Sequence, residues 1–381
     1  MNPPFYHGLR VGMLGGGQLG RMLIQAAVDY NLHIRVLDPA ADAPCRPYAH
    51  AFVQGDLMDY DTVMRFGQDC DLLTIEIEHV HAGALAALQA AGKIVRPDPS
   101  IIRLIQDKRE QKLFFRQYGF PSAPFRLTET AEDVEAFAEA LPLVQKLARA
   151  GYDGRGVQIL RSRADLSRAF DAPGLLEDYV PFAKELAVIA SRNPQGETVV
   201  YPVVEMQFHP EHNLVEYLFA PADIPPHTAH EAQQLARRVL HDLNYTGTMA
   251  VELFLTEEGG LLINELAPRP HNSGHHTIRA CYTSQYENHL RTILGLAPGD
   301  PAQHTPAAMV NLLGAPGHSG PARYAGIEEA LRMPGVYPHL YGKSETRPFR
   351  KMGHVTLIDP DPARLHAKAA QVKALIQVIS A

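Results

Sequence analysis

Residues 262–275 read LINELAPRPHNSGH, and the fold prediction for the rest of the chain starts from this stretch. The apolar run at residues 261–263 predicts a β-strand, and Asn264 and Glu265 lead from it into a polar segment. Two prolines exclude a helix there, because proline lacks the amide hydrogen and clashes with the preceding turn. We therefore expect a strand that ends at a polar site.

Residues 249–255 predict a second strand just upstream, and the glycines in residues 257–260 suit a tight turn. We expect the two strands to pair as a hairpin with Glu252 on one strand and Glu265 on the other. Paired carboxylates suit magnesium, which proteins usually hold with one or two carboxylates plus substrate phosphates. Glutamates are more often solvated surface residues, but the polar side chains after this strand are too dense for an ordinary turn. They are Arg269, His271, Asn272 and His275.

The bulk composition predicts a globular protein with more than one core. A length of 381 residues indicates two or three domains, and 46% hydrophobic residues with 20% charged residues is typical of soluble proteins. The net charge of −7 argues against a nucleic-acid binder, and the three cysteines lack the spacing of a disulfide framework or zinc ribbon. No leader pattern and no apolar run of ~18 residues is present. We therefore expect a cytoplasmic protein without membrane contact.

The N-terminal part contains a β-strand, a glycine-rich turn, a helix and a second strand. The turn at residues 15–20, GGGQLG, stands between a predicted strand at residues 9–14 and a helix at residues 21–27, with the next strand at residues 34–38. This is formally the dinucleotide-binding fingerprint and leaves an NAD-dependent dehydrogenase open as one reading. Glycines at a strand-to-helix junction bind many anions, however, so the motif alone is weak.

Further strands at residues 51–55, 72–75 and 93–97 predict a parallel sheet with helices on both faces, and ligands then bind beyond the carboxyl ends of its strands. Glu76 and Glu78 follow one of these strands. They are either solvated edge acids or contacts to a substrate hydroxyl or amine, and the sequence leaves both possibilities open.

The middle of the chain contains several groups suited to phosphates. A helix predicted over residues 100–118, with Ser100 as N-cap, carries Lys108 and Lys112. A strand at residues 143–149 carries Lys146, which can meet a phosphate as a point charge. The loop at residues 150–157 contains three glycines, so its amides can close over a polyphosphate, although a surface turn is the alternative.

Charged residues near two further strands, one acidic pair and one basic run, suggest contacts to a nucleotide or phosphate. Glu177 and Asp178 follow an apolar strand and can bind an adenine amine or ribose hydroxyls, or simply end that strand. A single helix over residues 277–294 should bury Cys281. A basic run follows nearer the C-terminus, for which a phosphate monoester is the natural partner and a solvated face the alternative. It comprises Arg347, Arg350, Lys351 and His354.

Taken in order, these motifs resemble the ATP-grasp ligases, and among them the 5-(carboxyamino)imidazole ribonucleotide synthetases of purine biosynthesis. The motifs that carry the resemblance are residues 15–20, 74–78, 151–156, 264–275 and 350–354. They span nearly the whole chain, and the last two are the most specific. Val157 and Met206 depart from the family pattern, which usually has Gln and Asn there, and Lys108 replaces an Arg of some relatives.

The resemblance implies a mixed α/β and α+β ATP-grasp architecture. A Rossmann-like domain with a parallel sheet would occupy residues 1–110, a two-lobed ATP-grasp domain residues 111–298, and a small β-rich domain residues 299–381. It further implies a homodimer, ATP and magnesium as cofactors, and ATP-dependent carboxylation of 5-aminoimidazole ribonucleotide with bicarbonate through carboxyphosphate. A mutase that consumes the product is a possible transient partner, and no nucleic acid or membrane is expected.

By motif position, the resemblance also implies the site residues. Magnesium would be held by Glu252 and Glu265. The nucleotide would contact Lys108, Lys146, Gly151, Tyr152, Asp153, Gly154, Arg155, Gly156, Val157, Glu177, Asp178, Tyr179, Val180, Glu185, Asn264 and Glu265. The ribonucleotide and bicarbonate would contact Gln18, Leu19, Glu76, His271, Asn272, Lys343, Arg350 and Lys351. Catalytic roles would fall to Arg269, Asp153, Tyr152, Arg155 and His271.

Three other functions remain open at this point. A formate-dependent glycinamide ribonucleotide transformylase would share the acyl-phosphate chemistry. An NAD-dependent dehydrogenase would leave the two-glutamate hairpin and the second glycine loop unexplained. A nucleotide sensor without catalytic activity would show no steady ADP production.

Overall fold

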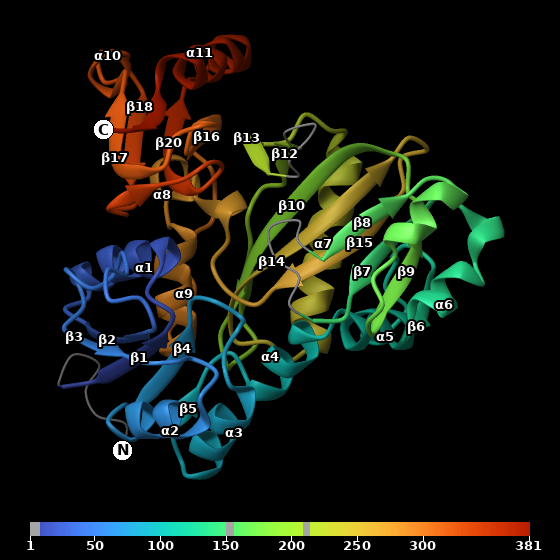
Figure 1. The fold of residues 1–381 in the computed structure, drawn as a ribbon. Helices are drawn as coiled ribbons and strands as arrows, with labels where there is room; N and C mark the ends of the chain where they lie inside the picture. The colour runs from blue at the N-terminus through green and yellow to red at the C-terminus, as the bar shows by residue number, and fades with distance from the viewer. Residues whose placement is uncertain (1–7, 150–155, 209–213) are drawn as a thin grey trace.

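The structure is a computed structural model that describes residues 8–149, 156–208 and 214–381 (Figure 1). The predicted residues Gly151, Tyr152, Asp153, Gly154 and Arg155 lie outside the described residues. Among the described helices, none combines the length and apolar character needed to cross a bilayer.

The N-terminal region forms a five-stranded parallel sheet, as the alternation of strands and helices predicted. Its strands are, in spatial order, β3 (Ala51–Gln54), β2 (His33–Asp38), β1 (Arg10–Leu14), β4 (Leu72–Ile75) and β5 (Ile94–Val95). One face packs on α1 (Gln18–Asp29) and, from far along the chain, on α9 (Gln285–Ile293). The other face packs on α2 (Tyr60–Gln68) and α3 (Ala82–Ala90). The carboxyl ends of β1 and β4 therefore point toward the rest of the molecule (Figure 1).

The single helix predicted over residues 100–118 is wrong, because the chain breaks at Asp107. The two helices are α4 (Pro99–Gln106) and α5 (Lys108–Gln117). Asp107 has extended backbone angles and accepts a hydrogen bond from Arg109 N, so it is the N-cap of α5. Ser100 is not the N-cap of α4 either: Asp98 takes that place and accepts from the Ser100 amide. The break places Lys108 in the first turn of α5.

A small lobe is built on a four-stranded antiparallel sheet (right in Figure 1). Its strands are, in spatial order, β6 (Phe125–Thr128), β9 (Gly174–Asp178), β7 (Leu143–Leu147) and β8 (Val157–Leu160). The short α6 (Ala131–Glu135) begins after Thr130, whose side chain forms a capping box with Asp133. This lobe presents Lys146 and Glu177 toward the large sheet.

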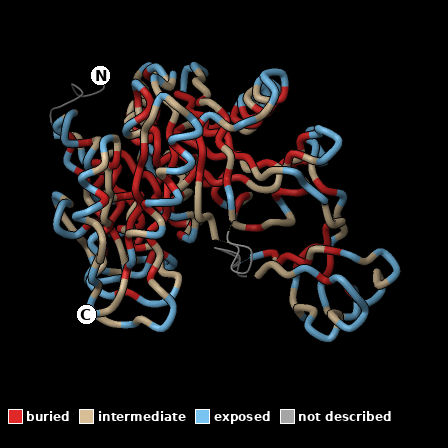
Figure 2. Tube along the Cα trace, turned by 90° about the horizontal axis from the view of Figure 1, so that it is seen from above, coloured by how far each residue is buried: buried red, intermediate tan, exposed pale blue. Residues whose placement is uncertain are grey.

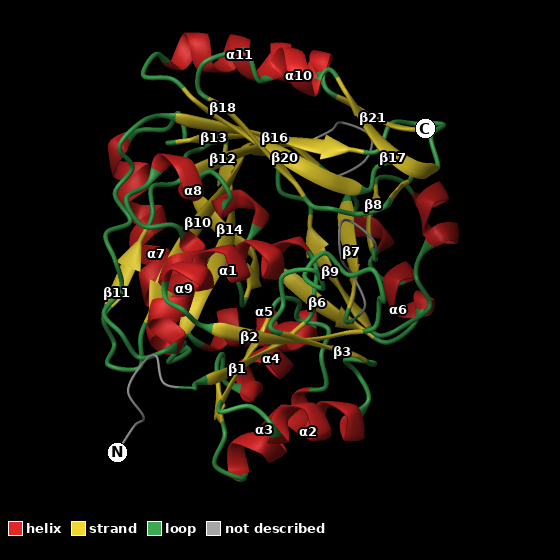
Figure 3. Cartoon of the chain, turned by 90° about the vertical axis from the view of Figure 1, so that its left-hand side faces the viewer, coloured by secondary structure: helices red, strands yellow, loops and turns green. Residues whose placement is uncertain are grey.

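The large sheet has nine strands and runs from the predicted hairpin into the C-terminal region. Its path is β15 (Leu261–Ala267), β14 (Gly247–Thr256), β10 (Phe182–Arg192), β12 (Val204–Phe208), β13 (Val215–Ala220), β16 (Ala307–Leu313), β20 (Lys351–Ile358) and β18 (Val336–Leu340), with β11 (Thr198–Val200) beside β10. The helix α7 (Pro226–Asp242) and α5 pack on the β10, β14 and β15 end. Figure 3 shows α10 (Ile327–Ala330) and α11 (Pro362–Leu375) over the C-terminal strands, beside the small sheet of β19 (Glu345–Thr346), β17 (Gly320–Ala325) and β21 (Gln377–Ser380).

The single helix predicted over residues 277–294 is also interrupted. It consists of α8 (Thr277–Ala280) and α9, and between them Cys281 makes an isolated β-bridge with Gln303. Ser284 caps α9 by accepting from the Glu287 amide. Cys281 is buried, which confirms its predicted core position, whereas the next residue, Tyr282, is 69% exposed.

Buried polar contacts join the N-terminal sheet to the large sheet. His289 of α9 contacts Thr74 Oγ1 of β4 at 3.0 Å and accepts a hydrogen bond from Thr248 N of β14 at 3.1 Å. These strands lead to Glu76 and to Glu252, respectively. Figure 2 shows the buried segments, in red, inside a layer of exposed ones. The two halves of the candidate site are thus joined through the buried His289 side chain.

Candidate active site

The hairpin of β14 and β15 places the two predicted glutamates directly opposite each other. Glu252 pairs with Glu265 in the antiparallel register, and Leu253 pairs with Ile263. Asn264 is therefore an extra residue, a β-bulge that turns its side chain and that of Glu265 to the same face of the sheet. The expectation that the strand ends after Ile263 is wrong, because β15 continues to Ala267. Without the bulge, Asn264 and Glu265 would face opposite sides.

Two predicted lysines reach this face from different elements. Lys108 Nζ, at the start of α5, donates to Glu265 Oε2 at 2.5 Å. Lys146 Nζ, on β7 of the small lobe, donates to Asn264 Oδ1 at 2.9 Å. The small lobe and the large sheet therefore meet at this polar face. Positive and negative groups in one cleft are what a magnesium nucleotide requires.

Glu177 has a different partner set from the one predicted. Its buried carboxylate lies between Lys146 Nζ and Lys112 Nζ, each 2.8 Å from one of its oxygens. Lys112 was not predicted as a site residue, although it follows Lys108 by four residues and so shares its face of the helix. The two lysine charges hold the pKa of the Glu177 carboxyl below its usual value against the opposing effect of burial. Glu177 thus fixes Lys146 in place.

We expect Glu177→Gln to lower the free energy of unfolding by about 3 kcal/mol, because two buried lysines lose their counter-charge. Asp178→Asn is the matched control: Asp178 is the next residue, pairs with Arg126 and is 42% exposed. Its loss should cost less than about 1 kcal/mol. Urea unfolding of both variants measures the difference, and equal costs would show that the buried cluster contributes no special stability.

The environment of the two opposed glutamates is suited to a divalent cation. Burial, and then the charge of Glu265, raise the pKa of the Glu252 carboxyl, while Lys108 lowers the pKa of the Glu265 carboxyl. A cation between the two carboxylates would offset both the burial and their mutual repulsion. Across the described part of the chain, no group of three or more His, Cys, Asp and Glu side chains could hold a metal. Nucleotide phosphates and water are the ligands that magnesium commonly uses beside one or two carboxylates.

His271 and Arg269 extend the site from the hairpin toward the N-terminal domain. His271 Nε2 lies 3.3 Å from Glu252 Oε1, and its Nδ1 accepts from the Ser273 amide. Burial, helped by the charges of Arg269 and Lys351, lowers the pKa of His271 to about 3, so its ring is neutral. Arg269 is held by Glu78 in a bidentate pair, at 2.5 Å and 3.1 Å. Glu78 therefore holds Arg269 in position. Of the two acids after β4, it is neither a solvated edge residue nor a free substrate contact.

Glu76 occupies the glycine-rich turn of the N-terminal domain. Its Oε1 accepts from Leu19 N at 3.1 Å, and a side chain at Gly15 or Gly17 would collide with its carboxylate. Burial raises the pKa of this carboxyl to about 7. An internal carboxylate therefore takes the place where a dinucleotide pyrophosphate would sit in the dehydrogenase reading. Gln18 begins α1 beside it, whereas the Leu19 side chain packs in the core.

The other predicted substrate contacts come from the loop after β15 and from the C-terminal strands. The Asn272 side-chain amide exchanges hydrogen bonds with that of Asn311, at 3.0 Å and 3.2 Å. Lys343 Nζ donates to the Lys351 carbonyl at 2.6 Å, and Arg350 donates to the Glu345 carbonyl at 2.6 Å. The charge of Lys351 acts on His271. The basic run therefore approaches the site from the C-terminal side.

The remaining predicted nucleotide contacts lie on the small lobe and on β10 of the large sheet. Gly156 has a positive φ of 72°, and Val157 begins β8. Asp178 pairs with Arg126, and Tyr179 lies against the Arg161 guanidinium, followed by Val180. Burial raises the pKa of the Glu185 carboxyl to about 7. Met206, the other departure from the family pattern, packs in a core beside β10 and β13.

Three family models match successive parts of the chain. Residues 9–106 match the ribonucleotide synthetase preATP-grasp domain, residues 113–286 the ATP-grasp domain and residues 307–368 the phosphoribosylaminoimidazole carboxylase C-terminal domain. An N5-carboxyaminoimidazole ribonucleotide synthase from Synechococcus elongatus is 38% identical over 91% of this chain and 89% of its own length. A chloroplastic phosphoribosylaminoimidazole carboxylase from Vigna aconitifolia is 38% identical over 94% of this chain, which spans 66% of that relative.

Solved structures are similar over nearly the whole chain. The N5-carboxyaminoimidazole ribonucleotide synthetase from Thermotoga maritima is 38% identical, with a TM-score of 0.90 over 98% of this chain and 100% of its own. The synthase from Aspergillus clavatus in complex with ADP and 5-aminoimidazole ribonucleotide is 33% identical, with a TM-score of 0.86 over 97% and 98%. These matches confirm the predicted ATP-grasp fold and the resemblance that the motifs carried. The chain therefore belongs to the N5-carboxyaminoimidazole ribonucleotide synthase family of ATP-grasp enzymes.

Proposed function

We propose that this chain carboxylates 5-aminoimidazole ribonucleotide with bicarbonate and ATP, giving 5-(carboxyamino)imidazole ribonucleotide, ADP and phosphate. The observation that carries the proposal is the hairpin face, where Glu252 and Glu265 stand opposite each other beside Lys108 and Lys146. The matched relatives are named for this activity. ATP is the cofactor of the family, and we propose magnesium as the metal at the two glutamates.

In the first step, a bicarbonate oxygen attacks the γ-phosphorus of ATP, the bond to the β-phosphate oxygen breaks, and carboxyphosphate and ADP form. Lys108 and Lys146 would hold the phosphates, because both ammonium groups already point to the hairpin face. Magnesium, when bound, supplies charge neutralisation of the polyphosphate. Phosphoryl transfer needs positioning and charge compensation rather than a protein nucleophile, and the lysines and glutamates of the hairpin face are suited to both.

In the second step, the exocyclic amine of the ribonucleotide attacks the carboxyl carbon, phosphate leaves and the nitrogen loses a proton. Arg269 would stabilise the negative charge of carboxyphosphate, since Glu78 fixes its guanidinium in one orientation. His271 lies between Arg269 and Glu252, and its neutral ring donates Nε2–H toward the glutamate. We assign His271 to orienting the carboxyl donor, together with Tyr152, Asp153 and Arg155 from the second glycine loop.

The ribonucleotide would lie between the N-terminal turn and the C-terminal strands. Gln18 and Glu76 are proposed to contact its ribose or base, and Lys343, Arg350 and Lys351 its 5′-phosphate. The adenosine of ATP is proposed to lie along residues 177–180 and Glu185.

An assay of ADP release tests the proposed function against its nearest alternative. We expect ADP production to require both bicarbonate and 5-aminoimidazole ribonucleotide, and formate with glycinamide ribonucleotide to give no more ADP than the background. Absence of substrate-dependent ADP release would instead favour a nucleotide sensor. Quenching of nicotinamide fluorescence on mixing with NADH would favour the dehydrogenase, which the Glu76 carboxylate in the glycine turn argues against.

We further propose a cytoplasmic homodimer, as the family resemblance implies. Light scattering should give twice the 42.0 kDa mass of one chain. A mutase is the proposed consumer of the unstable product, and its addition should speed the decay of the carbamate in a coupled assay.

A further inference from the structure

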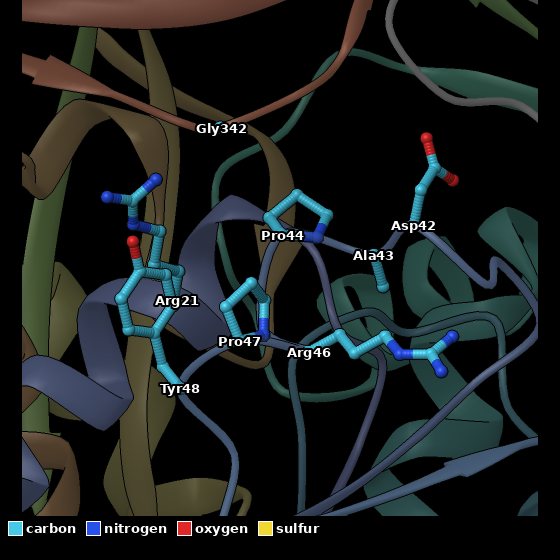
Figure 4. Close-up of a pocket in the computed structure, with 8 residues that line it drawn as sticks. All are labelled: Arg21, Asp42, Ala43, Pro44, Arg46, Pro47, Tyr48 and Gly342. Atoms are coloured by element: carbon cyan, nitrogen blue, oxygen red, sulfur yellow. The ribbon is translucent and has the colours of Figure 1, made fainter.

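A pocket lies between the N-terminal domain and the C-terminal strands, beside the proposed phosphate position. Its volume is about 280 Å³, and Figure 4 shows the residues that line it. They are Arg21, Asp42, Ala43, Pro44, Arg46, Pro47, Tyr48 and Gly342. Seven come from α1 and the segment after β2, while Gly342 comes from the turn between β18 and β19. The pocket therefore exists only where the two regions meet.

Arg21 occupies the part of this pocket nearest to the turn at Gly342. A Cβ added to Gly342 would come within 2.9 Å of Arg21 Nη1, so the guanidinium lies directly against this turn. Its carbon lies 4.8 Å from the centre of the Tyr48 ring. Among the described residues, none forms a hydrogen bond or ion pair with the Arg21 guanidinium, whose contact is the Tyr48 ring. A guanidinium packed on an aromatic ring, with its donors still available, is suited to bind an anion.

The other charged groups of the pocket have protein partners. Arg46 donates to the Ala41 carbonyl at 2.6 Å and lies over the Phe52 ring. Asp42 accepts from Ser344 Oγ at 3.2 Å. In Figure 4 the Arg46 and Arg21 guanidinium groups point in opposite directions. Arg46 thus belongs to the wall of the pocket, whereas the donors of the Arg21 guanidinium are not used by any other described residue.

The turn that Arg21 touches leads directly into the basic run of the C-terminal region. Lys343 follows Gly342 and is tied to Lys351 through the Lys351 carbonyl. Arg21 and Arg350 also act on the same group, since the charges of both lower the pKa of Tyr324 against the larger, raising effect of burial. Cations from α1 and from the C-terminal strands therefore gather around one place. Like charges repel, so this gathering favours an anionic ligand that compensates them.

We propose that Arg21 binds the 5′-phosphate of the ribonucleotide, so that this phosphate joins α1 to the turn before Lys343. The inference rests on the proposed function and adds a residue that the family motif did not assign. The α1 helix also carries Gln18, one turn earlier, which is proposed to contact the same substrate. A phosphate monoester would receive the planar pair of donors of Arg21 and the point charge of Lys343. Phosphate binding would thereby fix the N-terminal domain against the C-terminal strands.

The test compares two ligands that differ only in the phosphate. Dissociation constants of 5-aminoimidazole ribonucleotide and of its dephosphorylated riboside are measured by calorimetry in the presence of ADP and magnesium. We expect Arg21→Ala to weaken ribonucleotide binding about 10- to 100-fold, the usual effect of losing a charged hydrogen bond. Binding of the riboside should change by less than about 2-fold, and Arg21→Lys should restore part of the loss.

Arg46→Ala is the matched control, because it removes a guanidinium from the same pocket that is already bound to the protein. Arg46→Ala should change the affinity for the ribonucleotide by less than about 3-fold, which is the size of effect expected when a weak or indirect contact is lost. If Arg21→Ala weakens ribonucleotide and riboside equally, or weakens neither, the proposed contact is wrong. Failure of the wild-type protein to bind the ribonucleotide at all would overturn the proposed function instead, so the two failures are distinguishable.

Discussion

Replacing Glu265 with Gln is expected to lower kcat for substrate-dependent ADP release by about a thousandfold or more, the scale of losing a major electrostatic contact of a phosphoryl-transfer site. Glu265 is the more strongly ionised member of the opposed pair, because Lys108 lowers its pKa. Gln keeps the shape but cannot supply the charge that magnesium requires. Ribonucleotide affinity should stay within about 3-fold, since neither the glycine turn nor the basic run contacts Glu265. A discontinuous ADP assay and calorimetry measure the two effects.

Glu252→Gln should abolish turnover without lowering stability, so it separates the catalytic role of Glu252 from any structural role. Because burial and Glu265 raise the pKa of Glu252, the neutral amide should be accepted with a change in unfolding free energy below about 0.5 kcal/mol. Glu265→Gln should cost about 1 kcal/mol, because Lys108 loses a partner that is 40% exposed. Both variants should lose turnover.

Glu257→Gln is the matched control for these two variants, since Glu257 lies exposed in the turn of the same hairpin. It should keep wild-type turnover and stability. Near-normal ADP release by Glu265→Gln would show that the hairpin glutamates do not hold the metal, and would remove the observation on which the proposed function depends.

The hairpin shows how far sequence alone could predict this site. The apolar runs and the EEGG turn fixed which strands pair, and the structure confirms that Glu252 faces Glu265. Sequence could not predict the bulge at Asn264, because a bulge depends on how the paired strand is aligned and not on local residue preference. The strand was therefore expected to end too early. The same bulge is what brings Asn264 and Glu265 to one face.

Helix interruptions were missed for a different reason. Residues 100–118 and 277–294 have helical spacing, and periodicity does not detect a single residue that leaves the helix. At Asp107 the break was nevertheless predictable, because aspartate is a favoured N-cap. At residues 281–284 the break depends on a β-bridge to Gln303, a residue distant in sequence. Long-range contacts of this kind cannot be predicted from one segment.

The partners of charged residues were the least predictable part of the site. The carboxylate of Glu177 lies between Lys112 and Lys146, and no local pattern predicted this pair of contacts. Glu76 was correctly placed beyond the strand, but its carboxylate in the glycine turn follows only from the packing of β4 against β1. Ion pairs join elements that are far apart in the chain, so they require the tertiary structure. The domain boundaries that the resemblance implied, at residues 110 and 298, stay predictions.

The stability of the protein should fall steeply as the pH is lowered from 6.5 to 5, because histidines are buried in neutral form. Burial lowers the pKa of His271 and His289 to about 3 and that of His276 and His339 to about 4. It also lowers the pKa of His275 and His354, whose rings stack at 4.5 Å. The unfolded chain takes up a proton at each ring below about pH 6.5, whereas the native state does not. Each histidine then costs about 2 kcal/mol at pH 5.

Two buried carboxyls act in the opposite direction. Burial raises the pKa of Glu76 and Glu185 to about 7, so the native state takes up protons at these groups between pH 7 and 5 while the unfolded chain does not. Each therefore gains stability on acidification over this range, and the raised pKa of Glu252 adds in the same sense. The histidines outnumber these acids by two to one. The net effect should thus be acid destabilisation, measured as a falling urea midpoint from pH 7 to pH 5.

His276→Asn tests the assignment at a single ring. His276 Nδ1 lies 3.1 Å from the Ser273 carbonyl, and an asparagine amide can make the same hydrogen bond. The variant should be less stable than the wild type at pH 7.5, because a ring is lost from a packed site. Below pH 6.5 the variant should nevertheless bind up to one proton fewer on unfolding, so its free energy of unfolding should fall less steeply with pH. The difference in stability between variant and wild type should therefore shrink by about 2 kcal/mol by pH 5. His227→Asn, at an exposed position of α7, is the matched control for the loss of one histidine. Parallel curves for His276→Asn and the wild type would show that this ring is protonated equally in the native and unfolded states, contrary to its burial.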